Sequence, residues 1–152
     1  MRPAELLLIL AALAVNSPAQ AREGGDMETV RVRYMVNAIE PAVDFYQQYL
    51  DFQVKQGPTP NVASLSGGHL ELVLSTPFGP GGAAKPMADG RKAEPGGWNR
   101  IIISVNNLQH EVDRLRNADL HFRSDILKGP GGSEILLDDP SGNPIELFQA
   151  GQ

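Results

Sequence analysis

Apolar and polar residues alternate along several short stretches of this chain, which is the pattern of strands with one buried face. The clearest of these stretches are residues 30–36, 69–75, 100–105 and 144–149. Two other segments, 39–50 and 108–118, carry apolar residues three or four positions apart and are predicted to be amphipathic helices. Strand and helix patterns therefore share one chain, as in an α+β domain.

The order of these elements occurs twice. Each copy begins with a strand and a helix, and three short strands follow. After the helices, the strands are predicted at residues 52–56, 62–66 and 69–75 and at residues 121–126, 133–137 and 144–149. Each helix ends near an aspartate, Asp51 or Asp119, which tolerates a left-handed turn better than most residues. The sequence thus predicts two tandem βαβββ modules that pair into one curved mixed sheet and bury its edges.

The domain predicted for residues 29–149 divides into module one (29–76), a linker (77–97) and module two (98–149). The linker is rich in Gly and Pro and has no periodicity. A connection of this length is either a plain linker between modules or a flap over a cavity with Trp98 at its root.

Residues 1–21 have the layout of a secretory signal peptide. Arg2 precedes an apolar run at residues 6–15, which is too short to span a bilayer, and Ala19-Gln20-Ala21 is an A-x-A cleavage signal. We therefore expect cleavage after Ala21 and a periplasmic or secreted protein. The alternative is translation from Met27 and a cytoplasmic product.

The composition narrows the classes of partner. The formal net charge is −5 and there is no basic cluster, which argues against nucleic acid and, once the signal is removed, against membranes. The chain has no cysteine, so disulfides, thiolate catalysis and Cys-ligated zinc are excluded. A small-molecule ligand is the expected partner, and a homodimer is left open.

Alternation assigns the strand residues to two faces of the predicted sheet. One face is apolar or aromatic, includes Tyr34, and is expected to pack against the helices. The other face carries charges on four strands, which a curved sheet would gather at the floor of one cavity. Its candidate site residues are Arg31, Arg33, His69, Glu71, Arg100, Glu146 and Phe148.

The run from Asp139 to Leu147, Asp-Pro-Ser-Gly-Asn-Pro-Ile-Glu-Leu, resembles the closing strand of the vicinal oxygen chelate superfamily. This family includes glyoxalase I, bleomycin-resistance proteins and extradiol dioxygenases. The resemblance extends to Phe45-Tyr46 in the first helix and covers nearly all of the chain after the signal. It implies four metal-ligand positions: a His, Gln or Glu from each first strand and a Glu from each last strand. Here these positions hold Arg31, Glu71, Arg100 and Glu146.

Arginine at two of these positions argues against a metal centre. A guanidinium has no lone pair to donate and stays protonated in proteins. Two carboxylates that face two cations form a poor site for a divalent ion. No cofactor is therefore expected. The alternative is a divalent metal held by Glu71, Glu146 and His69, the one histidine near a ligand position.

The charged face then carries two predicted ion pairs, either within each module or crossed between the modules. These charged residues either neutralise one another and have a structural role in the core, or they line a binding site. Three arginines face two glutamates, and an arginine fork binds carboxylate or phosphate in a bidentate manner.

The sequence therefore predicts an exported, metal-independent binder of a small polar or anionic molecule in an Arg/Glu-lined cavity. Trp98 and Phe148 are aromatic candidates for contact with the ligand. The second hypothesis is a metal-dependent enzyme of the same family, a lyase, isomerase or dioxygenase. The third is a structural or interaction module without a ligand.

Overall fold

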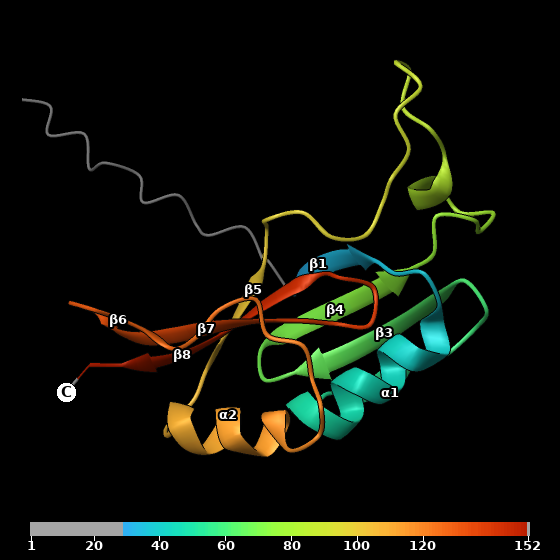
Figure 1. Cartoon of the computed structure of the whole chain (residues 1–152). Helices are drawn as coiled ribbons and strands as arrows, with labels where there is room; N and C mark the ends of the chain where they lie inside the picture. Colours follow the sequence, from blue (N-terminus) through green and yellow to red (C-terminus); the bar gives the residue numbers. More distant parts are fainter. Residues whose placement is uncertain (1–28, 152) are drawn as a thin grey trace, which may run out of the picture.

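The computed structural model describes residues 29–151, in which each module forms one four-stranded sheet and one helix (Figure 1). Module one contains β1 (Val30–Met35), α1 (Ile39–Leu50), β2 (Gln53–Gln56), β3 (Val62–Gly67) and β4 (Leu70–Ser75). Module two contains β5 (Ile101–Ser104), α2 (Leu108–Arg116), β6 (Leu127–Gly129), β7 (Gly132–Asp138) and β8 (Pro144–Ala150). A short 3₁₀ helix, η1 (Gly82–Ala84), lies in the linker.

The two sheets have the same topology. Their strand orders are β1-β4-β3-β2 and β5-β8-β7-β6. The first strand of each module runs parallel to the last, and the remaining pairs are antiparallel. A parallel neighbour requires a crossover, and this is where each module places its helix. The predicted α+β fold of two βαβββ modules is confirmed.

The eight described strands form two separate ladders where the sequence predicted one continuous sheet. Tyr34 of β1 joins them through its side chain. Its hydroxyl accepts a hydrogen bond from the amide of Ile101 (2.8 Å) and donates one to the carbonyl of Pro144 (3.1 Å). Burial raises the pKa of this hydroxyl, which keeps it a donor. The modules are thus joined by side-chain contacts at the junction.

Both helices cover the same face of the sheets, and the linker lies on the opposite side (Figure 1). The face predicted to be apolar is the one that the helices bury. Tyr34, Leu72, Leu74, Ile145 and Leu147 all belong to the core. Val30, at the start of β1, is the exception and is exposed. The alternation in the sequence therefore assigned the two faces correctly, and the charged face is open.

One predicted strand is wrong. Residues 121–126 form no strand, only an isolated bridge between Phe122 and Leu137, and β6 follows later at Leu127–Gly129. The backbone bends at Arg123 and Ser124, and the Arg123 side chain turns onto Asp138 (Nε–Oδ1 2.6 Å). The apolar residues that alternate in this segment, Phe122 and Ile126, pack against the core, but the segment forms no hydrogen-bonded ladder with a neighbouring strand.

The helix ends agree more closely with the sequence. Helix α1 has the predicted bounds, and α2 ends at Arg116, two residues before the predicted end. Asp51 and Asp119 both have φ of 57°, so both adopt the predicted left-handed conformation.

The turn of residues 139–143, here called the inter-module turn, is built around a buried carboxylate. Asp139 is 4% exposed. Its two oxygens accept hydrogen bonds from the Tyr46 hydroxyl (3.1 Å), the amides of Ser141 (2.8 Å) and Asn143 (2.9 Å), and the Asn143 side chain (2.8 Å). Burial raises the pKa of Tyr46 well above 10.0, and the Asp139 carboxylate raises it further. Asp139 is therefore a structural acceptor.

Asn143 extends this turn to the rest of the chain. Its side-chain nitrogen donates to the carbonyl of Met35 in module one (2.9 Å), and its oxygen accepts from the amide of Gly96 in the linker (2.7 Å). Module one, the linker and module two therefore meet at the inter-module turn.

The predicted signal peptide, residues 1–21, lies outside the described residues. Within residues 29–151, neither helix has the length and apolar character needed to cross a membrane.

Candidate functional site

A cavity of about 500 Å³ opens on the face of the first sheet that lies opposite α1. Strands β1, β3 and β4 supply most of its walls. The lining residues that matter for its chemistry are Arg31, Arg33, Val62, Ser64, Glu71 and Val73. Three of the residues predicted from the sequence, Arg31, Arg33 and Glu71, are therefore brought together.

Glu71 carries the fixed negative charge of this cavity, and three groups bind its carboxylate. Ser64 donates to Oε1 (2.6 Å), Lys55 donates to Oε2 (2.9 Å), and Nε of Arg31 lies 3.3 Å from Oε1. Arg31 stands directly opposite Glu71 in the parallel pair β1–β4. Of the two arrangements that the sequence allowed, this pair forms within its own module.

The hydrogen bonds from Ser64 and Lys55 lower the pKa of Glu71 below the ordinary value of 4.5, an effect that outweighs the opposing effect of burial. A carboxylate held ionised in this way is a poor proton acceptor at neutral pH. Glu71 is therefore suited to an electrostatic role in this cavity and is unsuited to general-base catalysis.

Lys55 is a site residue that the sequence did not reveal. The register of β2 against β3 shifts between Val54 and Gln56, so Lys55 occupies an irregular position. Val54 lies opposite Leu65 on the apolar face, so alternation places Lys55 on the charged face, beside Glu71. The four-residue strand holds a single apolar residue, Val54, and this pattern is too weak to single out Lys55 from the sequence.

Glu71 gives the stability of the fold a defined pH dependence. A glutamate with a lowered pKa stabilises the folded state above its unfolded pKa, and this contribution is lost as the pH falls through the folded pKa. We expect Glu71→Gln to unfold at a lower temperature than the wild type at pH 7, with the difference shrinking below about pH 4. Thermal unfolding followed by circular dichroism measures the difference in unfolding temperature at each pH. Glu40→Gln, at an exposed position of α1, is the control, and a Glu71→Gln difference that is the same at pH 3 and pH 7 would contradict the prediction.

Arg33 is the cation of the cavity without a carboxylate partner. Its Nη1 donates to the hydroxyl of Ser75, and it forms no ion pair with any residue of 29–151. A guanidinium has five N–H donors, so most of the donors of Arg33 have no acceptor within this range. The charge of Glu71 is already shared by Arg31 and Lys55. The cavity therefore carries excess positive charge.

Arg100 and Glu146 form a second ion pair in module two, with Nε and Oε2 2.5 Å apart. The Glu146 side chain is 5% exposed and that of Arg100 is 31% exposed. Glu146 lies opposite Ile102, so this pair is diagonal, unlike the pair in module one. Neither residue is part of the cavity lining described above. Of the four charges that the sequence predicted in one cavity, this cavity therefore holds the two of module one, Arg31 and Glu71.

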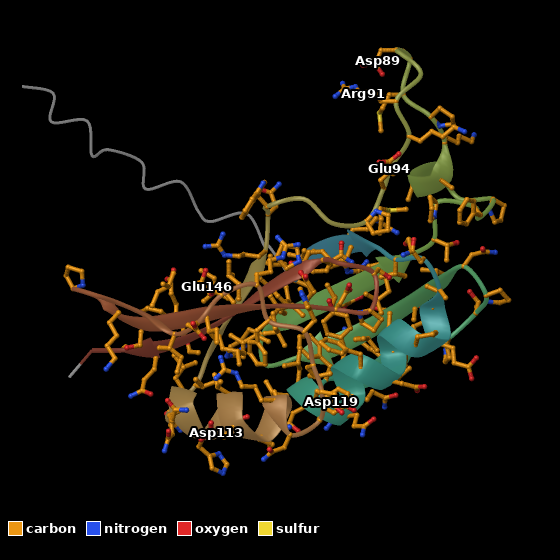
Figure 2. The ribbon with its side chains drawn as sticks, in the orientation of Figure 1. Asp89, Arg91, Glu94, Asp113, Asp119 and Glu146 are labelled. Carbon is orange, nitrogen blue, oxygen red and sulfur yellow. The ribbon has the colours of Figure 1, made fainter. Side chains whose placement is uncertain are left out.

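The other predicted residues lie elsewhere. Trp98 is 76% exposed, and the guanidinium carbon of Arg123 lies 5.6 Å from its ring centre. Phe148 is half-buried beside Ser104 in the second sheet, and His69 is exposed in the turn before β4. None of the three lines the cavity. Figure 2 shows Glu146 on the second sheet and Asp89, Arg91 and Glu94 on the part of the linker that projects from both sheets.

The residues at the four metal-ligand positions that the resemblance implies do not fit a metal ion. Two of them are guanidinium groups, which cannot donate a lone pair. Both oxygens of Glu71 are bound by side chains of the chain itself. Within residues 29–151, no three acidic or histidine side chains converge closely enough to hold a metal. A metal-dependent reaction therefore finds no support in this donor set.

Comparison with known proteins identifies the scaffold. A family model described as "Glyoxalase/Bleomycin resistance protein/Dioxygenase superfamily" matches residues 29–147. No curated protein matches the sequence.

Three solved structures illustrate the similarity of fold. Lactoylglutathione lyase from Agrobacterium tumefaciens is 13% identical, with a TM-score of 0.64 over 81% of this chain and 93% of that one. A superfamily member from Sphaerobacter thermophilus DSM 20745 is 22% identical, with a TM-score of 0.62 over 80% and 95%. TioX from Micromonospora sp. ML1 is 17% identical, with a TM-score of 0.63 over 81% and 98%. At these identities the likeness establishes the fold alone.

Proposed function

The chain belongs to the glyoxalase/bleomycin resistance protein/dioxygenase superfamily, and from that premise we propose that it binds a small anionic molecule without a metal, in the cavity of module one. The observation that carries this proposal is the arrangement of charges. Both carboxylate oxygens of Glu71 are bound, by Arg31, Lys55 and Ser64. Arg33 lines the same cavity and forms no ion pair with another described residue.

A metal-free site of this kind recognises its ligand through fixed charge and shape. Arginine is suited to this role because its planar fork matches the geometry of a carboxylate or a phosphate. Val62 and Val73 add apolar wall to the same cavity. Its volume of about 500 Å³ is in the range of small-molecule sites. The favoured ligand is therefore a small anion with an apolar portion.

Arg33→Gln is expected to weaken binding of such an anion at least about tenfold, since it removes a charge-assisted contact. Arg31→Gln should weaken binding less, because Arg31 is already engaged with Glu71. A thermal-shift screen of small carboxylates and phosphates identifies a ligand, and calorimetric titration of the variants measures its affinity. Arg91→Gln is the matched control, because Arg91 lies on the projecting linker and pairs with Asp89.

Two results would overturn the proposal. One is an affinity for every ligand found that is unchanged in Arg33→Gln. The other is a stoichiometric metal in the purified protein that is lost in Glu71→Gln or Glu146→Gln, which would favour the metal-dependent enzyme.

We also propose that the protein is exported, on the basis of the sequence of residues 1–21. Cleavage after Ala21 leaves an N-terminus at Arg22. Mass spectrometry of the protein purified from the periplasm or medium tests this directly. A cytoplasmic product that begins at Met1 or Met27 would contradict it.

A further inference from the structure

A second cavity of about 400 Å³ adjoins the first on module one. Arg33, Thr59 and Val62 line both cavities, so the two meet at these three residues, of which Arg33 carries the charge. The linker supplies the far wall of the second cavity, through residues 79–84. In Figure 1, η1 of this segment lies on the side of the first sheet opposite α1.

The second cavity differs chemically from the first. Arg33 is the one charged residue in its lining. Its polar groups bind one another: Thr76 donates to the side chain of Asn61 (2.9 Å), and Ser75 accepts from Arg33. The wall that the linker supplies, residues 79–84, consists of Gly, Pro and Ala. This space is therefore suited to an uncharged group of modest size.

The position of Arg33 between the two cavities constrains where a ligand carries its charge. An anion bound to Arg33 stands at the junction, with free space on both sides. A straight chain with a terminal carboxylate fills one cavity and leaves the other empty. A carboxylate on a branch point extends one arm into each.

We propose that the ligand is a two-armed monoanion whose carboxylate sits on a branch point, as in an N-acylated amino acid. This inference rests on the proposed function and adds the ligand class. The carboxylate pairs with Arg33. One arm lies against Val62 and Val73 in the first cavity, and the second arm lies against Ala83 and its neighbours in the linker.

Two probes that share a carboxylate and a branched apolar arm test this proposal. Isocaproate has the single arm, and N-butanoyl-leucine adds the acylamino arm at the branch point. We expect the wild type to bind N-butanoyl-leucine at least about tenfold more tightly than isocaproate in calorimetric titrations, because the second arm buries additional apolar surface.

Ala83→Leu should abolish that difference by filling the second cavity, while the affinity for isocaproate stays unchanged. The retained affinity also shows that the variant is folded. Ala88→Leu, the same substitution at an exposed linker position that lines neither cavity, should keep the difference.

The outcomes distinguish failure of the two-armed ligand from failure of the proposed function. Equal affinity of the wild type for both probes overturns the two-armed ligand, as does a preference for N-butanoyl-leucine that survives in Ala83→Leu. A loss of both probes in Ala83→Leu also overturns it, because the substitution would then act on the first cavity. If neither probe binds while another anion from the thermal-shift screen binds through Arg33, this inference fails and the proposed function stands. If Arg33→Gln leaves the affinity for both probes unchanged, the proposed function fails and this inference fails with it.

Discussion

Asp139→Ala is expected to lower the free energy of unfolding by about 3 kcal/mol or more. The substitution removes an acceptor that serves four hydrogen bonds. It leaves the hydroxyl of Tyr46 and two backbone amides without partners in a buried region. Unsatisfied buried donors cost more than the bonds themselves contribute.

Chemical denaturation followed by circular dichroism measures this change. Tyr46→Phe removes one of the four bonds and should cost only about 1 kcal/mol. Asp113→Ala is the control, because Asp113 is exposed on α2 (Figure 2) and its loss should change stability by less than about 0.5 kcal/mol. If Asp139→Ala is as stable as Asp113→Ala, the inter-module turn does not hold the fold together.

Arg100→Leu is expected to destabilise the fold by about 3 kcal/mol, because it leaves the buried carboxylate of Glu146 without its ion-pair partner. The double variant Arg100→Leu/Glu146→Leu should recover most of that loss. Replacing both partners of a buried pair by apolar residues is often neutral, since the cost of desolvating two charges disappears with them. The double-mutant cycle therefore separates the effect of an orphaned charge from that of the pair.

Module one supplies an internal comparison. Arg31→Leu should cost less than Arg100→Leu, because Glu71 keeps Lys55 and Ser64 when Arg31 is removed. Denaturant midpoints of the variants measure the ranking. A double variant as unstable as Arg100→Leu, or equal losses for Arg31→Leu and Arg100→Leu, would contradict this account.

Much of the fold could be predicted from the sequence because the patterns that specify its strands and helices lie within short stretches of the chain. Alternation located the strands and the buried face, and helical spacing fixed α1 at both ends. The failure at residues 121–126 has the opposite cause. The bend there follows from the contact between Arg123 and Asp138, which are brought together only by tertiary structure.

The candidate site also has residues that the sequence could predict and residues that it could not. Arg31, Arg33 and Glu71 could be found because alternation and the internal repeat place them on one face of neighbouring strands. Lys55 could not, since β2 has one apolar residue, Val54, and so carries too weak a pattern to single out its neighbour. The separation of Arg100 and Glu146 from this cavity depends on how the two sheets meet, which no pattern within either module records.

The inter-module turn explains why the motif that identifies the family is compatible with so many chemistries. Its Asp and Asn bind the two halves of the molecule and leave the reacting surface to other residues. The groups that line the cavity can therefore be exchanged without touching the contacts that hold the two modules together. The motif therefore reports that a chain can assemble this scaffold, and it carries no information on which chemistry the scaffold performs.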